Sequence, residues 1–257
     1  MRTTSLHNPG LDGGPFLWES GPTGVLLLHG FTATTAEIRP LARLLHLAGH
    51  SVSGPLLPGH GTVPADLNRV RWQDWVAAAE ESYVALAERC TTVVVGGESM
   101  GAVVALALAA RHPEIAGVLC YAPAIRLNLS RGDLLKMRLA SLVVAQVPRE
   151  SLDGAETWQG YPGLPLKGAA QLLALQKATL PVLGAIRQPL LIVQGRLDTT
   201  IDPRSGEIIR STVGSSDVRL HWLERSSHAV TLDSGLDEVA RLSLELIDSV
   251  TPPPPTP

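Results

Sequence analysis

The sequence of 257 residues has few aromatic side chains, only two cysteines and a small net charge. Aromatic residues make up 4% of the chain, and the formal net charge is -3 at pH 7. Lysine and arginine form no cluster and are not interleaved with aromatic residues, so no nucleic-acid partner is expected. The longest uninterrupted apolar run, 102–110, is far too short to cross a bilayer, so no stable membrane insertion is expected.

The two cysteines, Cys90 and Cys120, do not have CxxC spacing, and nothing places them in an oxidising compartment. Both are expected to be inert thiols. The histidines show no metal-ligand spacing of the HExxH kind, so neither a metal nor another cofactor is predicted. Residues 1–14 lack the charged-then-apolar layout of a secretion signal, which predicts a cytoplasmic protein.

Short apolar segments bounded by glycine or proline alternate with helix-like segments through most of the chain. This alternation is typical of one α/β domain, with a mostly parallel sheet and helices on both faces. The expected strands are 24–28, 51–53, 91–95, 117–121, 189–193 and 218–223. The last of them alternates apolar and polar residues, as a strand near the sheet edge does. The expected helices are 37–47, 72–89, 100–111, 203–212 and 236–249.

Ser99 lies in the sequence Gly97-Glu98-Ser99-Met100-Gly101, between a β-branched run and an alanine- and leucine-rich stretch. This pattern between a strand and a helix is typical of a nucleophile elbow, in which a strained turn exposes the serine hydroxyl. Glycine is expected at positions 97 and 101 because a Cβ there would strike the neighbouring strand or helix. The pattern predicts a serine hydrolase. The alternative is a serine that caps an ordinary helix.

Acyl transfer by a serine needs a general base and an acid that orients the base, and in this topology both follow the serine along the chain. Asp198 comes just after the expected strand 189–193 and is the predicted acid, since a carboxylate there can accept the Nδ1 proton of an imidazole. His228 lies in the loop after the last expected strand and is the predicted base. Asp202 is the rival acid, but its place before Pro203 suits a helix start better.

Two backbone N–H groups are expected to stabilise the oxyanion. One is the N–H of Met100, directly after the serine, and the other is the N–H of Phe31, in the loop after the first long strand. Gly30 is expected to permit a tight turn that points the Phe31 N–H inward. His29 is expected to be a structural hydrogen-bonding residue, and the loop 57–61 is expected to be part of the scaffold.

The regular alternation stops between Pro123 and Arg187, where roughly sixty residues separate two consecutive strands and must carry their own structure. Two apolar groups indicate two helices there: Leu135, Leu139, Leu142 and Val143 on one helical face, and Leu172, Leu173 and Leu175 in a second group. We expect a core of 1–122 and 188–250, and a helical cap of 123–187 over the active site. The alternative is two sheet-covering helices without substrate contact. The proline-rich tail 251–257 is expected to be disordered.

With these motifs the chain resembles the α/β-hydrolase superfamily and, within it, the small bacterial carboxylesterases and monoacylglycerol lipases. The likeness runs from about Gly21 to Asp248 and covers five motifs in the order typical of the superfamily. It implies an α/β-hydrolase fold with a small helical cap, a triad of Ser99, Asp198 and His228, and an apolar acyl tunnel. It also implies a small-molecule ester as substrate, because family members cleave short- and medium-chain esters and monoacylglycerols.

Glu98 departs from this resemblance, since the relatives tend to carry an apolar residue beside the nucleophile. A carboxylate at this position is expected either to bond a neighbouring loop or to shift the titration of the imidazole. The fold also supports lactonases, thioesterases and C–C bond hydrolases, and a catalytically silent small-molecule receptor is a further alternative. An apolar cap predicts a preference for acyl chains of roughly six to ten carbons. The sequence predicts no oligomeric state.

Overall fold

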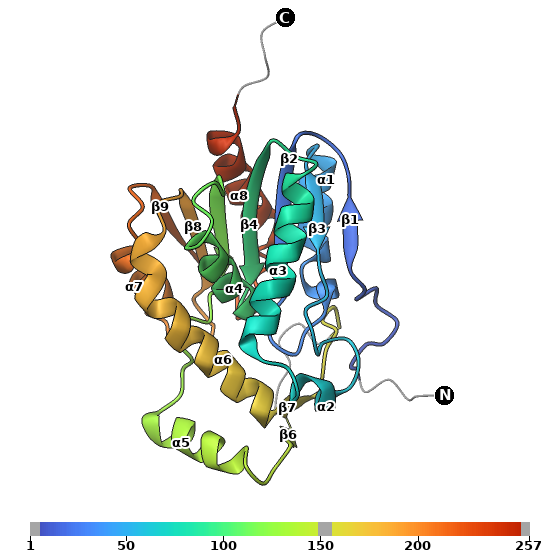
Figure 1. Ribbon diagram of the computed structural model, residues 1–257, viewed down its shortest axis with the longest axis vertical. Coiled ribbons are helices and arrows are strands. Elements are labelled where there is room, and N and C mark those ends of the chain that lie inside the picture. The colour runs from blue at the N-terminus through green and yellow to red at the C-terminus, as the bar shows by residue number, and fades with distance from the viewer. Residues whose placement is uncertain (1–5, 149–155, 253–257) are drawn as a thin grey trace, which may run out of the picture.

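A computed structural model of the chain describes residues 6–148 and 156–252. In this part of the chain, seven strands form one sheet in the order β1-β3-β2-β4-β5-β8-β9 (Figure 1). The strands are β1 (Phe16–Trp18), β2 (Thr23–Leu28), β3 (Ser51–Gly54), β4 (Thr92–Glu98), β5 (Gly117–Tyr121), β8 (Leu190–Gly195) and β9 (Val218–Leu223). Every neighbouring pair is parallel except β1 and β3. The predicted mostly parallel sheet is therefore confirmed.

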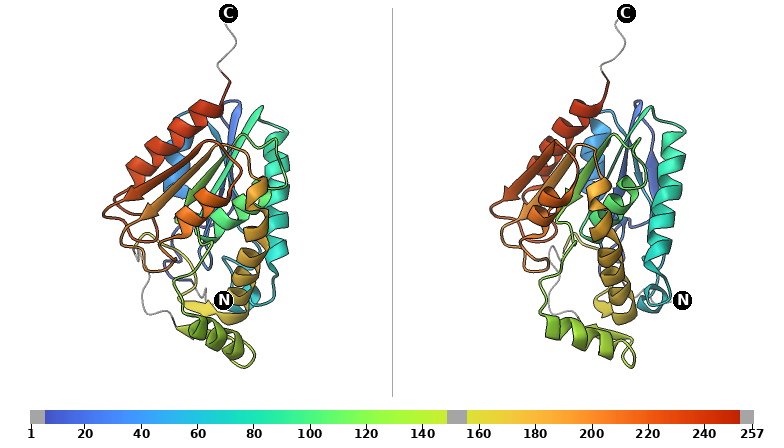
Figure 2. Two further views of the ribbon diagram at one scale, coloured as in Figure 1. Left: turned by 90° about the vertical axis from the view of Figure 1, so that its left-hand side faces the viewer. Right: turned by 60° about the vertical axis from the view of Figure 1, so that its left-hand side comes forward.

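Strand β2 shows why the sheet is covered on both faces. All six of its residues are buried, and alternate side chains enter two different apolar clusters. Leu26 and Leu28 pack on the side of α3 (Trp72–Ala87) and α4 (Met100–Ala109), whereas Val25 and Leu27 pack on the side of α1 (Arg39–Leu47) and α8 (Leu236–Val250). Figure 2 shows α8 and α3 on opposite sides of the sheet. A strand buried on both faces is continuously apolar, which is why a short apolar run identified it.

The five predicted helices are all present, with ends shifted by a few residues. Helix α1 begins at Arg39 rather than 37, because Thr35–Glu37 forms a separate 3-10 turn, η1. Helix α7 runs over Ser205–Thr212, and the short helix α2 (Pro64–Leu67) was not expected. Strand β4 extends to Glu98, three residues beyond the predicted end, so it leads directly into Ser99.

Strand β1 was not predicted, because three residues are too few to show a periodic pattern. It pairs antiparallel with β3, with Phe16 opposite Gly54. A Cβ on Gly54 would lie 2.3 Å from the Phe16 ring, so the glycine makes room for the ring. The Phe16 and Trp18 rings stack with centroids 4.4 Å apart, and the Arg39 guanidinium lies over Phe16. Aromatic packing holds this edge strand in place.

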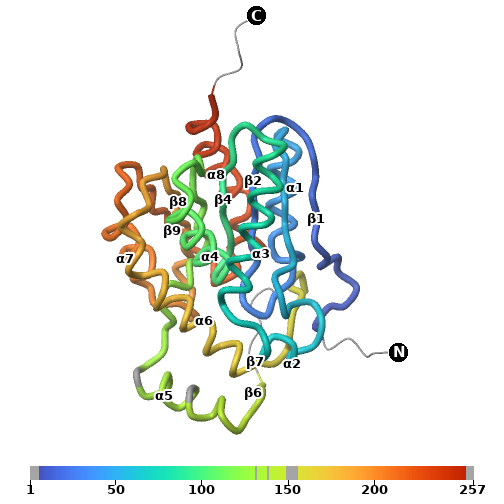
Figure 3. Tube along the Cα trace, viewed as in Figure 1, coloured from blue at the N-terminus to red at the C-terminus, as the bar shows by residue number. Residues whose placement is uncertain are grey.

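The segment between β5 and β8 contains helix α5 (Arg131–Ala140), the hairpin of β6 (Gln146–Pro148) and β7 (Gly163–Pro165), helix α6 (Leu166–Thr179) and the 3-10 helix η2 (Leu180–Ala185). Helix α6 contacts α3 and α4, and Leu175 on it is fully buried in the core. Helix α5 contacts α6 and stands farther from the sheet, as the tube in Figure 3 shows.

The predicted apolar helix face over residues 135–143 is wrong in its extent. Helix α5 ends at Ala140, because the chain turns back there toward β6. Leu142 and Val143 therefore lie beyond the helix, with 76% and 86% of their surfaces exposed. Leu135 and Leu139 are on the helix but are also exposed. The spacing of these four residues is helical, but no element in the described part of the fold covers them.

The two cysteines are free and buried, and burial raises the pKa of both thiols, as expected for inert groups. Residues 253–257 of the proline-rich tail lie outside the described residues.

Two buried imidazoles lie beneath the loop that follows β2. His29 donates from Nδ1 to the Gly30 carbonyl oxygen at 2.9 Å, and its Nε2 accepts the Leu57 N–H at 3.0 Å. These two bonds fix one neutral tautomer, so His29 is structural as expected. The His60 ring meets His29 edge-on, with centroids 4.8 Å apart. Burial lowers the pKa of His29 to about 4 and holds the pKa of His60 well below its ordinary range.

The low pKa of His29 makes stability depend on pH. The unfolded chain binds a proton on this histidine below about pH 6.5, whereas the folded protein resists it until about pH 4, so the stabilisation is lost as the pH falls through this window. Between about pH 7.5 and pH 5, His29 should lower the free energy of unfolding by about 2 kcal/mol. The variant His29→Gln keeps a donor and an acceptor without a titrating group. Over the same pH change, its free energy of unfolding should fall by about 2 kcal/mol less than that of wild type. Urea unfolding at both pH values measures this, and equal losses would contradict it.

The two helices of the 123–187 segment should differ in their contribution to stability. Leu175→Ala removes a fully buried side chain of α6, so the free energy of unfolding should fall by about 2–5 kcal/mol. Leu139→Ala removes the same number of atoms from the exposed surface of α5 and should change it by about 0.5 kcal/mol or less. Urea denaturation of the two variants makes the comparison. A large loss in Leu139→Ala would show that α5 is packed in solution.

Candidate active site

The turn from β4 to α4 holds Ser99 in a strained conformation. Its φ is 54° and its ψ is -110°, in a region that costs a residue with a side chain about 1–3 kcal/mol. The Ser99 N–H donates to the Tyr121 carbonyl oxygen at 2.8 Å, and the Ser99 carbonyl accepts the Ala124 N–H at 3.1 Å. Bonds on both sides of the residue therefore fix the turn.

The glycines on either side of Ser99 allow the end of β4, the start of α4 and the end of β2 to lie close together. A Cβ on Gly101 would lie 2.1 Å from the Leu28 carbonyl oxygen, and a Cβ on Gly97 would lie 2.5 Å from the same atom. Neither position can accept a side chain without moving the end of β2 away from the turn. These contacts match the reason for which glycine was expected at both positions.

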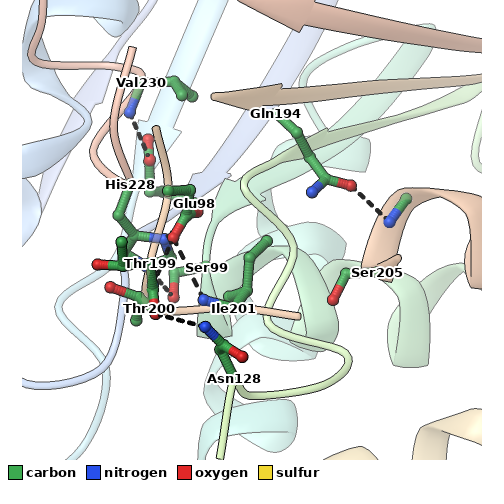
Figure 4. Close-up of polar contacts among 12 residues, drawn as sticks. Glu98, Ser99, Asn128, Gln194, Thr199, Thr200, Ile201, Ser205, His228 and Val230 are labelled. Carbon is green, nitrogen blue, oxygen red and sulfur yellow. Dashed lines mark hydrogen bonds and ion pairs between the residues drawn. The ribbon is translucent and has the colours of Figure 1, made fainter. Parts of the chain in front are cut away.

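His228 forms hydrogen bonds through both ring nitrogens. Its Nε2 lies 2.9 Å from Ser99 Oγ, and its Nδ1 lies 2.7 Å from Asp198 Oδ2. The side chains of His228 and Asp198 are 14% and 2% exposed. Figure 4 shows Ser99 and His228 pointing toward each other. The structure therefore brings together the three residues that the sequence selected, from the ends of β4, β8 and β9.

The carboxylate of Asp198 is itself oriented by backbone donors. Its Oδ1 accepts the N–H groups of Thr200 at 2.7 Å and Ile201 at 3.2 Å, which leaves Oδ2 for the imidazole. Gly195 brings the loops of the acid and the base together, since a Cβ there would lie 2.1 Å from the Ser227 carbonyl oxygen. A neutral imidazole in this setting donates from Nδ1 and accepts the serine proton at Nε2.

The two expected oxyanion donors come from the residue after Ser99 and from the loop after β2. Met100 is the first residue of α4, so helix geometry leaves its N–H without an intrahelical acceptor. The Phe31 N–H has no acceptor among the described residues. The turn expected at Gly30 is present, since the Gly30 carbonyl oxygen accepts the Ala33 N–H at 3.3 Å, and the left-handed residue inside the turn is Thr32, with a φ of 66°. A Cβ on Gly30 would also lie 2.9 Å from Glu37 Oε2, which accepts the Gly30 N–H.

A cavity of about 540 Å³ opens at Ser99 and His228. Much of its wall comes from the segment 123–187, including Met137 on α5 and Ala169 and Leu172 on α6. The expected alternative of helices that only cover the sheet therefore does not describe α6, which packs on the core and also lines the cavity. Further apolar lining comes from Phe31, Leu127, Leu129, Pro148, Trp158 and Leu164, and polar lining from Glu37, Asn128, Thr199 and Thr200.

Sequence reasoning missed the polar part of this wall. Glu37 follows the 29–32 loop within η1, and its carboxylate accepts the Trp158 indole N–H at 3.2 Å and the Gly30 N–H at 2.5 Å. Asn128 is held by its Nδ2 bond to the Thr199 carbonyl oxygen at 3.2 Å (Figure 4). No local pattern identifies these residues, because each is bonded to a residue more than seventy positions away in the chain: Glu37 to Trp158 and Asn128 to Thr199.

The rival acid and two further histidines lie in other settings. Asp202 accepts the Arg204 backbone N–H and binds its guanidinium at 2.8 Å; these bonds lower the pKa of Asp202 to about 2 and hold it before α7. His112 lies between two glutamates, and His221 pairs with Glu238. Within residues 6–148 and 156–252, no group of three or more histidine, cysteine, aspartate or glutamate side chains is placed to hold a metal ion. The same residues include no helix of the length and apolarity that would cross a membrane.

The chain is similar to known proteins over most of its length. The thermostable monoacylglycerol lipase of Bacillus sp. (strain H-257) is 36% identical over 237 residues, which are 90% of this chain and 92% of that protein. A carboxylesterase of Bacillus subtilis (strain 168) is 29% identical over 241 residues, 92% and 96% of the two chains. The solved structure of a metagenome-derived lipolytic enzyme is 32% identical, covers 93% of this chain and 99% of its own, and has a TM-score of 0.87.

These relatives confirm the resemblance to small carboxylesterases and monoacylglycerol lipases that the sequence motifs indicated. A sequence model described as the alpha/beta hydrolase family matches residues 25–242, which include Ser99, Asp198 and His228. With its sheet order, its elbow and this match, the chain belongs to the alpha/beta hydrolase family.

Proposed function

We propose that the protein is a serine carboxylesterase that hydrolyses short- to medium-chain carboxylic esters or monoacylglycerols through an acyl-enzyme. The observation that carries this proposal is the unbroken hydrogen-bonded series Ser99, His228, Asp198 at a cavity with apolar and polar lining. The relatives named as a monoacylglycerol lipase and a carboxylesterase support the ester as the bond that is cleaved.

In the first half of the reaction, Ser99 Oγ attacks the ester carbonyl carbon while His228 Nε2 takes the hydroxyl proton. Asp198 stabilises the imidazolium through its bond to Nδ1. The N–H groups of Phe31 and Met100 bind the oxyanion, where one such donor is worth about 3–4 kcal/mol in the transition state. The tetrahedral intermediate collapses, the C–O bond to the alcohol breaks, and His228 returns the proton to the leaving alcohol.

In the second half, a water molecule gives its proton to His228 Nε2 and attacks the acyl-enzyme carbonyl carbon. The bond to Ser99 Oγ then breaks, and His228 returns the proton to the serine as the carboxylic acid leaves. The same two N–H groups bind the second oxyanion.

Residues 123–187 act as a cap on a core made of 1–122 and 188–250. The contribution of α5 and α6 to the cavity wall supports this division, since the acyl chain then lies between the cap and the core. Each methylene that the apolar wall buries contributes up to about 0.8 kcal/mol, which favours acyl chains longer than acetyl.

The variant Ser99→Ala tests the nucleophile. On p-nitrophenyl esters from acetate to laurate, wild type should be active with an optimum near six to ten carbons, and the variant should lose at least about a thousandfold in kcat. A fluorophosphonate should label wild type covalently and leave the variant unlabelled. Activity that survives the substitution would contradict the assignment of Ser99. Covalent labelling of wild type without ester hydrolysis would indicate another acyl chemistry, such as a thioesterase or lactonase, and an unlabelled wild type would indicate a receptor.

A pair of cavity-wall variants tests the path of the acyl chain. Ala169→Leu fills part of the cavity and should shorten the preferred acyl chain, with kcat/KM falling about fourfold for each excluded methylene. Leu172→Ala enlarges the same cavity and should shift the preference toward longer acyl chains. The ester series measures both variants, with kcat/KM on the acetate ester as the internal control. Equal changes at all chain lengths would place the acyl group elsewhere.

A further inference from the structure

Glu98, the residue before Ser99, is fully buried at the end of β4. Its Oε1 accepts the Val230 N–H at 2.9 Å, and its Oε2 contacts the N–H of Thr231 at 3.2 Å and the hydroxyl of the same residue. Among the described residues no lysine, arginine or histidine pairs with it. A buried carboxylate without a cation is costly, so such a group is held in its neutral form unless its hydrogen bonds compensate fully.

Burial raises the pKa of Glu98 well above its ordinary range, and the negative charge of Glu37 raises it further. The bonds from Thr231 and Val230 act in the opposite direction but do not cancel this rise. The other titratable group that faces Glu98 is Tyr121 of β5, whose hydroxyl is bonded to Ser243 at 2.7 Å. Neither neighbour supplies a positive charge.

The Thr231 hydroxyl has two acceptor neighbours and can donate to only one of them. Its hydroxyl oxygen lies 3.0 Å from the Glu37 carbonyl oxygen and also contacts Glu98 Oε2. A hydroxyl has a single hydrogen, whereas a carbonyl oxygen can only accept. If that hydrogen is donated to the Glu37 carbonyl, the contact with Glu98 is a hydrogen bond only when the carboxyl group carries the proton and donates it to the hydroxyl.

These bonds join three parts of the active site. Val230 and Thr231 closely follow His228. Through its bonds to them, Glu98 connects the loop of the base to the nucleophile elbow (Figure 4). Thr231 then reaches the Glu37 backbone, and the Glu37 side chain accepts the Gly30 N–H next to Phe31. A continuous series of bonds therefore runs from the elbow through the base loop to the 29–32 loop.

We propose that Glu98 is a positioning residue, held as a neutral carboxylic acid, that fixes the His228 loop against the nucleophile elbow and, through Thr231, against the loop of Phe31. The consequence for the reaction rests on the roles given to His228 and Phe31 in the proposed function. The protonation state does not rest on them, so the two can be tested separately.

Infrared spectroscopy tests the protonation state without any substrate. The difference spectrum between wild type and Glu98→Gln at neutral pH should contain the carbonyl stretch of a protonated carboxylic acid, which is separate from the carboxylate bands. Glu19→Gln is the matched control, because Glu19 is largely exposed and should give only a carboxylate band. A carboxylate band alone in the Glu98→Gln difference would overturn the proposal, even if the esterase assignment is correct.

Kinetics tests the positioning role, with kcat expressed per site titrated by a fluorophosphonate. Glu98→Gln keeps one acceptor and one donor without a charge, so kcat should stay within about threefold and the pH profile of kcat/KM should be unchanged. Glu98→Leu keeps the volume but loses the bonds, so kcat should fall about 10- to 100-fold while KM stays within about twofold. Thr231→Val, which breaks the series at its middle, should change kcat in the same direction.

Two kinetic results would overturn the proposal. One is a loss in Glu98→Gln as large as in Glu98→Leu, which would mean that a charged carboxylate is needed. The other is a wild-type kcat per titrated site in Glu98→Leu with only a lower melting temperature, which would mean a purely structural role. If Glu98→Leu does not fold, Glu98→Gln and Thr231→Val decide, and a wild-type kcat per titrated site in Thr231→Val then counts against the positioning series.

Discussion

The close contact of the β4–α4 turn with the end of β2 is the constraint on which the site depends. Gly97 and Gly101 let this turn approach the Leu28 carbonyl to a distance that no side chain allows. The turn in turn gives Ser99 its strained φ, and backbone bonds to Tyr121 and from Ala124 hold it there. The strain of about 1–3 kcal/mol is small against the packing of a strand buried on both faces.

A second glycine contact sets the distance between the acid and the base. Gly195 ends β8 and lets the loop of Asp198 touch the backbone at Ser226 and Ser227, just before His228. Two places of close backbone approach thus bring together residues from three strand ends. The imidazole then has a partner at each of its two nitrogens, at 2.7 and 2.9 Å.

The histidines show how surroundings assign different roles to one residue type. His29 has two backbone partners and no access to solvent, so it stays neutral and supports a loop. His228 has a carboxylate on one side and a hydroxyl on the other in the wall of a cavity, so its position suits proton transfer. The sequence distinguishes these two residues only by their positions relative to the strands.

Much of the fold could be predicted because its signals are local. Buried parallel strands are continuously apolar, and the elbow is a five-residue pattern with a strand before it and a helix after it. The failures concern structure that depends on distant contacts. Strand β1 is held by rings and by Arg39, and the end of α5 is set by a turn that no residue pattern marks.

The candidate site shows the same division. Ser99, Asp198 and His228 were selected by order along the chain and by proximity to strand ends. The contact of Gly30 with Glu37 and the partners of Glu98 could not be predicted, because they depend on Glu37, Val230 and Thr231. The tight turn at Gly30 is a local feature and is present, whereas the carboxyl group beside it comes from η1.

The double role of α6 bears on how this enzyme's selectivity can evolve. Leu172 belongs to the hydrophobic core and to the cavity wall, so a substitution that reshapes the acyl site there also changes the stability of the whole domain. Met137 lines the same cavity from α5, a helix whose leucines at 135 and 139 are exposed. Substitutions on α5 can therefore change the substrate range with little effect on stability. Substitutions on α6 also lower stability and need compensating substitutions elsewhere.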